Sequence, residues 1–311
     1  MARIVAKYAF YPPRPTYSVV ACEDGSSYRL KLDLNAFPYL SNVSEPSELL
    51  AFYTTTQRQS KIVCLYVPSD GGCLSPVSSP RRATASTSST KAPYTVLFSH
   101  GNAVDLGATA DFLQEFARRF GVNILSYDYS GYGLSTGDLL ESNVYADAEA
   151  VMIELRERFN VPLERTILYG QSLGTAPTVE LATKYKVAGV VLHSPLMSGL
   201  RVVWPNLKTS FCFDAFTNIE KIPKIRSPTL IIHGTADDVI GVNHGRELYS
   251  RLPNPLEPLW VGGAGHNDIT EFPAYFDRLE RFFKQDLKAN FPLDELPSNN
   301  ISNCSSFKST C

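Results

Sequence analysis

The sequence predicts an α/β fold with a mostly parallel central sheet and helices on both of its faces. Apolar, β-prone runs recur at residues 61–67, 94–99, 122–127, 166–169, 187–193, 229–233 and 257–261. Helical patterns separate most of these runs, at residues 108–120, 141–159, 176–185, 242–252 and 273–288. Strands without alternating polar side chains, each followed by a helix, are typical of a parallel sheet that is covered on both sides. Residues 17–67 show strands without intervening helices, which predicts an antiparallel N-terminal edge.

These elements are expected to form one domain over residues 1–290. Residues 69–93 are rich in Ser, Thr and Pro and cannot bury apolar surface, so we expect a disordered insertion loop between two strands. Residues 194–223 form a sizeable insertion on the carboxyl side of the sheet, which predicts a short cap. The polar residues 291–311 predict a flexible C-terminal tail.

Composition excludes several classes of protein. The chain has 311 residues, a formal net charge of −2, 44% hydrophobic residues and 19% charged residues, which gives no electrostatic reason to bind nucleic acid. Its six cysteines lack Cys-x-x-Cys or Cys/His ligand spacing, so we expect reduced thiols and neither a disulfide framework nor a metal site. No apolar run approaches the ~18 residues of a membrane span. Residues 4–10, which Lys7 interrupts, are too short for a signal peptide.

Two stretches match Gly-x-Ser-x-Gly, the pattern of a nucleophile elbow, in which a sharp turn from strand to helix exposes a strained serine. Residues 170–174 directly follow a short β-prone run and lead into a helical pattern, so Ser172 is the candidate nucleophile. Residues 133–137 lie several residues after their strand, and no helix is expected before about Glu141. We expect Ser135 either to line the rim of the site or to belong to a tight turn.

A serine hydroxyl becomes a good nucleophile when a histidine takes its proton and a carboxylate fixes the tautomer of that histidine. In sheets of this kind the chain order is serine, acid, histidine. His266 follows the last predicted strand in a glycine-rich loop and is the candidate base. His100, His193 and His233 end predicted strands, and His244 opens a helix, where a solvated or capping role is expected.

The acid is expected just after the strand at residues 229–233. Asp237 and Asp238 are adjacent there, so their side chains diverge and only one of them reaches the histidine. Position favours Asp237, while Asp238 is the alternative acid and is expected to cap the next helix. Asp268 follows His266 too closely to orient it easily.

Acyl transfer also needs N–H donors directed at the developing oxyanion. The backbone N–H of Leu173, the residue after the nucleophile, is the first expected donor. The second is expected in the loop that follows His100, from the N–H of Asn102 or of Ala103. His100 itself is expected to hold this loop through a hydrogen bond. No metal ion or organic cofactor is implied.

Five longer motifs support a narrower interpretation. They are AKYAFYPP at residues 6–13, SHGNAVD at 99–105, YDYSGYG at 127–133, LYGQSLG at 168–174 and GAGHND at 263–268. Together they resemble the α/β-hydrolase superfamily and, within it, the alpha/beta-hydrolase domain-containing protein 17 family, from about residue 3 to about residue 285. The best-known members are palmitoyl-protein thioesterases, which remove S-acyl chains from membrane-bound proteins. The resemblance implies that Ser172, Asp237 and His266 form a catalytic triad.

The resemblance further implies substrates that are S-acylated, membrane-associated proteins, and a cytoplasmic enzyme peripheral to the cytosolic face of membranes. Animal members begin with acylated cysteines, a cluster that this chain lacks, so acylation of Cys304 or Cys311 is the alternative expectation. The N-terminal segment is expected either to pack on the domain or to lie on an anionic membrane face. Its basic and aromatic residues are Arg3, Lys7, Tyr8, Phe10, Tyr11 and Arg14.

The cap is expected either to receive an acyl chain, at ~0.8 kcal/mol for each buried CH₂, or simply to cover the sheet. Its apolar side chains are Leu196, Met197, Leu200, Val202, Val203, Trp204, Phe211, Phe213 and Phe216. Two other functions are compatible with the same residues: a different serine esterase, lipase or aminopeptidase-like hydrolase, and a non-catalytic protein that binds a lipid or another ligand.

Overall fold

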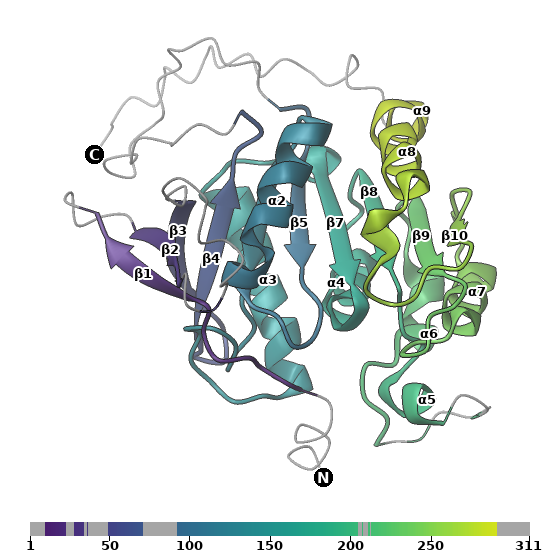
Figure 1. The fold of residues 1–311 in the computed structure, drawn as a ribbon, viewed down its shortest axis with the longest axis horizontal. Coiled ribbons are helices and arrows are strands. Elements are labelled where there is room, and N and C mark those ends of the chain that lie inside the picture. Colours follow the sequence, from purple (N-terminus) through teal and green to yellow (C-terminus); the bar gives the residue numbers. More distant parts are fainter. Residues whose placement is uncertain are drawn as a thin grey trace, which may run out of the picture.

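The central element of the protein is a mixed ten-stranded sheet with the order β1-β2-β3-β4-β6-β5-β7-β8-β9-β10 (Figure 1). The computed structural model describes residues 10–22, 28–33, 36, 49–70, 92–204, 207, 211 and 213–290. Strands β1 to β4 pair antiparallel, and β4 also pairs antiparallel with β6. Strands β5 to β10 run parallel, which confirms the predicted fold class. The strands are β1 (Tyr17–Ala21), β2 (Tyr28–Leu32), β3 (Leu49–Thr55), β4 (Lys61–Val67), β5 (Thr95–Ser99), β6 (Asn123–Tyr127), β7 (Thr166–Gln171), β8 (Gly189–His193), β9 (Thr229–Gly234) and β10 (Leu259–Val261).

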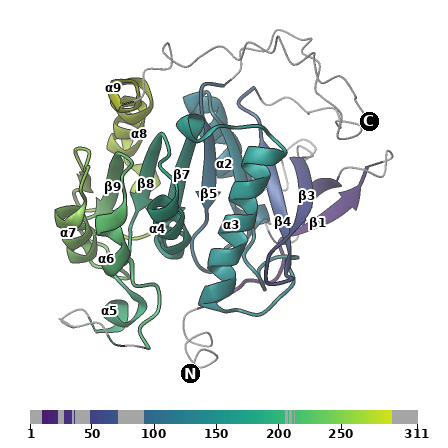
Figure 2. The same cartoon turned by 180° about the vertical axis from the view of Figure 1, so that it is seen from behind.

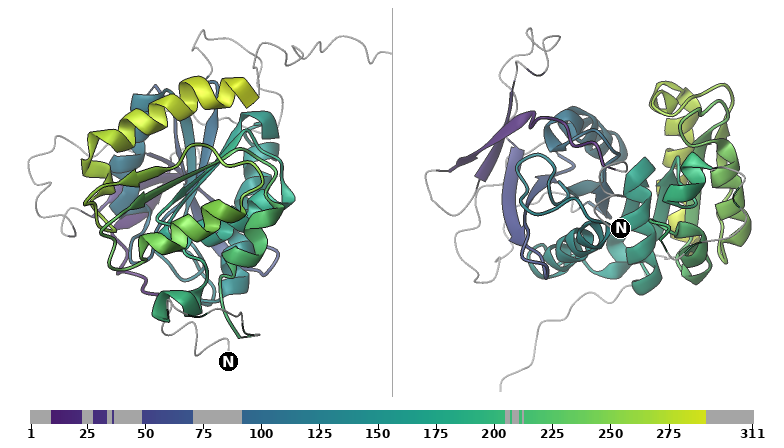
Figure 3. Two further views of the ribbon diagram at one scale, coloured as in Figure 1. Left: turned by 90° about the vertical axis from the view of Figure 1, so that its right-hand side faces the viewer. Right: turned by 90° about the horizontal axis from the view of Figure 1, so that it is seen from below.

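Helices cover both faces of this sheet (Figures 1 and 2). One face carries α2 (Leu106–Phe120) and α8 (Pro273–Arg281). The other carries α3 (Glu141–Glu157), α4 (Thr175–Lys184), α6 (Asn218–Lys221) and α7 (Val242–Arg251). The short helix α5 (Gly199–Val203) lies beyond the carboxyl ends of the parallel strands (Figure 1). The view from below in Figure 3 looks at these strand ends, where ligands of open α/β sheets bind.

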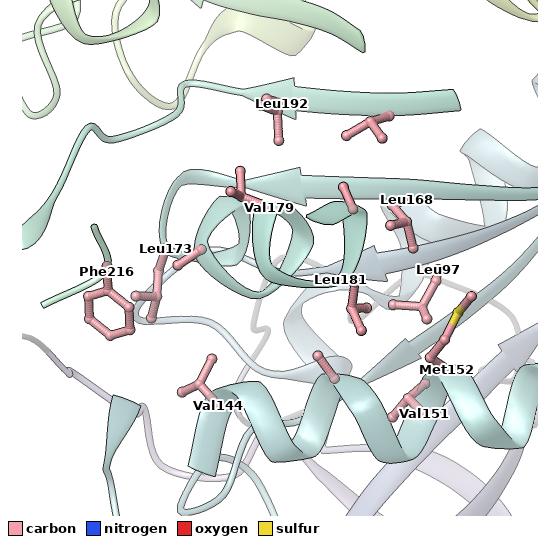
Figure 4. Close-up of a cluster of buried hydrophobic side chains, with 14 of the residues drawn as sticks. Leu97, Val144, Val151, Met152, Leu168, Leu173, Val179, Leu181, Leu192 and Phe216 are labelled. Atoms are coloured by element: carbon pink, nitrogen blue, oxygen red, sulfur yellow. The ribbon is translucent and has the colours of Figure 1, made fainter. Parts of the chain in front are cut away.

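The period of two along each strand divides the core into two hydrophobic clusters. Leu97 and Leu168, paired across β5 and β7, face α3 and α4, and their neighbours Val96 and Ile167 face α2 and α8. All four side chains are buried. Because both faces of the sheet are buried, each of these strands is a continuous apolar run in the sequence. Figure 4 shows the first cluster, with Met152 of α3 close to Leu97 and Leu168.

The helix predicted over residues 273–288 departs from a regular α-helix. It consists of α8, a π-helical turn at Phe282–Asp286 and α9 (Leu287–Asn290). A π turn adds one residue to the turn, and here both Phe282 and Phe283 are buried. Phe283 packs on Phe116 and Phe120 of α2, with ring centroids 6.1 and 5.1 Å apart.

The predicted insertion loop and tail fall mainly on residues 71–91 and 291–311, which lie outside the described residues. Within the described part of the chain, none of the helices combines the length and apolar character that a membrane crossing requires.

Candidate active site

Ser172 stands at the turn between β7 and α4, in the strand-turn-helix context predicted for residues 170–174. Its φ of 51° is a left-handed conformation that is strained for a residue with a side chain. The two glycines of the motif permit this turn. An added Cβ at Gly170 would lie 2.4 Å from the carbonyl oxygen of Gly174, and one at Gly174 would lie 2.0 Å from that of Ser99. The two glycines are therefore required because β7, α4 and β5 lie in close contact here.

His266 and Asp237 lie beside Ser172 as the order along the chain predicts. The Ser172 Oγ is 3.0 Å from the Nε2 of His266, and the Nδ1 of His266 is 2.7 Å from the Oδ2 of Asp237. With the imidazole neutral and protonated at Nδ1, Ser172 donates to His266 and His266 donates to Asp237. This is the geometry that transfers a proton from a serine to a histidine.

The carboxylate of Asp237 is fixed by several donors. Its Oδ1 accepts from the N–H groups of Val239 and Ile240, at 3.0 and 2.7 Å, which leaves Oδ2 facing His266. The Nε2 of His233 is 3.3 Å from the same Oδ2 and donates to the Ile240 carbonyl at 2.7 Å. Burial opposes ionisation, but the hydrogen bonds from His233, His266 and Ile240 lower the pKa of Asp237 below its usual range. Asp237 therefore stays ionised at neutral pH.

The glycine-rich loop that carries His266 packs directly on the end of β9. An added Cβ at Gly234 would meet the carbonyl oxygens of Ala264 and Gly265 at 2.3 and 2.5 Å, so only glycine permits this approach. The Oδ1 of Asp268 accepts from the Gly265 N–H at 2.7 Å. Asp268 thus stabilises the loop without orienting the imidazole.

Buried polar side chains link the strand of Ser172 to the helix that follows His266. The Tyr169 hydroxyl is 3.0 Å from the Nδ1 of His193 and 2.8 Å from the Tyr275 hydroxyl. Burial, together with the nearby His266 and His233, lowers the pKa of His193 to about 3. His193 is therefore neutral at physiological pH and places no positive charge near His266.

The two expected oxyanion donors belong to segments that adjoin Ser172. Leu173 follows Ser172 and is buried in the cluster of Figure 4, at the same end as Phe216. The loop after β5 passes beside the serine, because a Cβ added at Gly101 would lie 3.8 Å from the Cβ of Ser172. Of the two candidates in that loop, the Ala103 N–H donates to the Oδ1 of Asn102 at 3.1 Å, which favours the N–H of Asn102.

Related proteins match this chain over most of its length. The chain is 47% identical over 286 residues to alpha/beta hydrolase domain-containing protein 17B of Xenopus tropicalis, covering 92% of each chain. Identity to the human 17B protein is 46% over 286 residues, again covering 92% of each chain. The chain belongs to the alpha/beta hydrolase domain-containing protein 17 family. The protein is therefore an α/β hydrolase, and its family supports the assignment as a serine hydrolase.

More distant similarities agree with the fold described above. Residues 90–211 match the family model described as "Serine aminopeptidase, S33". Among solved structures, the Pyrococcus furiosus esterase Pf2001 superposes with a TM-score of 0.57 at 19% identity, covering 78% of this chain and 93% of that one. At this identity the superposition establishes the fold alone.

The second Gly-x-Ser-x-Gly stretch of this family member is a tight turn. Ser135 is buried, donates to the Asp128 carbonyl at 3.0 Å and accepts from the Val63 N–H at 2.9 Å. Gly133 and Gly137 both take positive φ values, of 50° and 102°. Of the two roles expected for Ser135, the structure therefore supports the turn.

Two expectations about neighbouring residues are wrong. His244 is buried and not solvated: its Nδ1 accepts from the Met197 N–H at 3.0 Å, and burial lowers its pKa to about 4. Asp238 does not cap α7, whose N-cap is Gly241 without a side-chain hydrogen bond. Asp238 is exposed, because Asp237 makes the hydrogen bonds of this turn. His100 meets expectation, since its Nδ1 is 2.8 Å from the Gly101 carbonyl oxygen.

The cap divides its apolar side chains between core and surface. Leu196, Met197 and Phe216 are buried, so they cover the sheet. At its base, the buried Arg201 and Asp214 form an ion pair at 3.4 Å. Val203, Trp204, Phe211 and Phe213 are instead exposed.

Sequence reasoning missed His233 and Tyr132 as neighbours of the candidate residues. His233 precedes Asp237 by four residues, a spacing that becomes informative once β9 is known to end between them. Tyr132 contacts Asn102 from a loop thirty positions away, and no local pattern predicts that contact. Among the described residues, no group of three or more His, Cys, Asp or Glu side chains is arranged to bind a metal ion.

Proposed function

We propose that this protein is a serine hydrolase that removes long-chain S-acyl groups from protein cysteines through an acyl-enzyme. The observation that carries the proposal is the continuous path Asp237–His266–Ser172, with contacts of 2.7 and 3.0 Å that end at a strained serine. The family resemblance supports a thioester as the substrate.

In the first half of the reaction, the Ser172 Oγ attacks the thioester carbonyl while its proton moves to the Nε2 of His266. Asp237 stabilises the imidazolium that forms. The N–H groups of Leu173 and Asn102 donate to the oxyanion of the tetrahedral intermediate. When the intermediate collapses, the C–S bond breaks and the leaving cysteine sulfur takes the proton from His266.

In the second half, water attacks the ester formed at Ser172. His266 accepts a proton from that water and returns it to the Ser172 oxygen as the C–O bond breaks, which releases a fatty acid and restores the enzyme. Every proton is carried by the chain's own residues, so the proposal requires neither a metal ion nor an organic cofactor.

We infer that the substrates are S-acylated membrane-associated proteins, reached by peripheral contact with the cytosolic face of membranes. The exposed apolar side chains of the cap support this inference, because Trp and Phe are typical of surfaces that lie in the membrane interface. Sedimentation of the protein with anionic vesicles tests it. Protein that stays in the supernatant at every vesicle concentration would contradict peripheral contact.

Labelling with a fluorophosphonate probe tests the nucleophile, and release of palmitate from an S-palmitoyl peptide tests the substrate. Ser172→Ala should abolish labelling and lower activity at least ~10³-fold. Ser135→Ala is the matched control from the second motif and should keep its label. Cleavage of oxygen esters or aminoacyl amides without cleavage of the thioester would favour another hydrolase. Absence of a Ser172 adduct in the folded protein would favour a ligand-binding protein.

A further inference from the structure

The loop expected to bind the oxyanion is strained. It joins β5 to α2 through residues 100–105, and Gly101 lies against Ser172. Ala103 has a φ of 60°, a left-handed conformation that is unfavourable for a residue with a side chain. Strain of this kind persists where surrounding contacts over-determine the backbone. The contacts that fix this loop therefore decide where its N–H groups point.

Three of these contacts are hydrogen bonds to the side chain of Asn102. Its Oδ1 accepts the N–H of Ala103 at 3.1 Å, the hydroxyl of Tyr132 at 2.6 Å and the N–H of Tyr11 at 3.0 Å. The first donor belongs to the loop itself. The other two come from distant parts of the chain, so they connect the orientation of Asn102 to Tyr11 and Tyr132.

The segment of Tyr11 also contacts the far end of the loop. Thr16 donates its N–H to the Oδ2 of Asp105 at 2.8 Å, and its hydroxyl donates to Oδ1. Asp105 is the N-cap of α2 and accepts from the Ala108 N–H at 3.0 Å. A Cβ at Gly107 would lie 2.3 Å from the Thr16 Oγ1, so the helix is shaped to receive this segment.

Aromatic packing holds the same segment at the carboxyl ends of the strands. Phe10 is buried, and its ring lies edge-on to those of Tyr132 and Phe216, at centroid distances of 6.4 and 5.7 Å. In the view from below, the segment before β1 reaches the middle of this end of the sheet (Figure 3). Residues 10–16 therefore connect the loop, the cap and the turn of Tyr132.

We propose that residues 10–16 are a positioning segment of the active site, which together with Tyr132 orients Asn102 so that its backbone N–H can stabilise the oxyanion. The inference rests on the proposed function and adds a requirement to it. Tyr11 and Tyr132 act through Asn102 and touch no substrate. Weakening them should lower kcat and spare KM, because the oxyanion exists only in the transition state.

Two matched pairs of variants test the proposal. Tyr11→Pro removes the N–H donor in a segment that already continues with Pro12 and Pro13, and Tyr11→Ala removes the exposed side chain but keeps the donor. Tyr132→Phe removes the second donor and keeps the ring. Tyr127→Phe is its control, since it also deletes a buried hydroxyl, bonded at 2.9 Å to the Oγ of Ser99.

The readouts are kcat and KM for p-nitrophenyl palmitate, the inhibition constant of a palmityl trifluoromethyl ketone, and the melting temperature. The ketone forms a tetrahedral adduct with serine and so reports on oxyanion stabilisation. We expect Tyr11→Pro and Tyr132→Phe each to lower kcat ~10- to 10²-fold and to weaken ketone binding by the same factor, because one lost donor costs ~10²–10³. Tyr127→Phe should stay within about threefold of wild type, and Tyr11→Ala should lose less activity than Tyr11→Pro because it keeps the N–H donor.

The possible failures are distinguishable. A wild-type protein that a fluorophosphonate does not label would overturn both the proposed function and this inference. A labelled wild type whose kcat and ketone affinity survive Tyr11→Pro and Tyr132→Phe would overturn the positioning segment alone. Equal losses of kcat in all four variants, accompanied by lower melting temperatures, would show that the segment only stabilises the fold. That result would also overturn the inference.

Discussion

Gly174 offers a sharp test of the active-site packing. An added Cβ at this position would lie 2.0 Å from the Ser99 carbonyl oxygen and 2.6 Å from that of His100. Both atoms belong to the backbone that leads into the loop beside Ser172, so no flexible side chain can move aside. Gly174→Ala must therefore separate the start of α4 from the end of β5 by about 1 Å. A shift of this size in reacting groups costs ~10²-fold in rate.

We expect Gly174→Ala to lower kcat/KM for p-nitrophenyl palmitate ~10²-fold and the free energy of unfolding by ~1–3 kcal/mol, because the core becomes overpacked. Steady-state kinetics and urea unfolding measure the two effects. Gly262→Ala is the control: nothing lies within 4 Å of its added Cβ, and its φ lies outside the left-handed region. Activity of Gly174→Ala within threefold of wild type would refute the argument that this contact sets the geometry of the site.

Three further predictions follow from buried charges. Asp237→Asn should lower kcat ~10⁴-fold in the same assay, because an amide does not hold His266 as the Nδ1–H tautomer; a loss below tenfold would exclude Asp237 as the acid. Burial raises the pKa of Asp147 to about 7, despite two hydrogen bonds from Ser130. The pKa of an Asp carboxyl in the unfolded chain is about 3.9. At pH values between these two pKa values, the folded protein therefore holds a proton that the unfolded chain has released. Stability relative to Asp147→Asn should therefore fall as pH rises through that window, and urea unfolding that gives the same difference at pH 4 and pH 8 would contradict this. Arg201→Met should cost ~3–5 kcal/mol in the free energy of unfolding, because it leaves Asp214 buried without its partner. Arg201→Met combined with Asp214→Leu should recover most of that loss, and an equal or larger loss in the double variant would show that the charge pair is not the cause.

The sequence was sufficient for the parallel core and for the order of the candidate residues. Strands buried on both faces leave an apolar run that polar interruptions delimit clearly, and β4 has the predicted bounds of 61–67. The positions of Ser172, Asp237 and His266 beside one another follow from the common edge at which parallel strands end. Their catalytic roles stay predictions until the variants are measured.

Other features depend on contacts that are distant in sequence. His244 opens a helix and looks like a surface residue, but the cap folds over it and its imidazole accepts from the Met197 backbone. The π turn at Phe282–Asp286 depends on the aromatic side chains of α2 against which Phe283 packs. Asp237 and Asp238 differ by one position, and it is the turn after β9 that decides which of them faces His266.

The parallel order also decides where foreign sequence can be attached. Just after β4, the Ser69 N–H donates to the side chain of Asn123 at the start of β6, and residue 92 lies just ahead of β5. Leu287 of α9 packs over Gly189, the first residue of β8. Both junctions thus lie at the amino ends of the parallel strands, a full strand length from Ser172. An affinity tag or fluorescent protein fused after Asn290, or spliced between 70 and 92, will leave access to the serine open, whereas one fused directly ahead of Phe10 will lie at the carboxyl ends of the strands, the edge that carries Ser172.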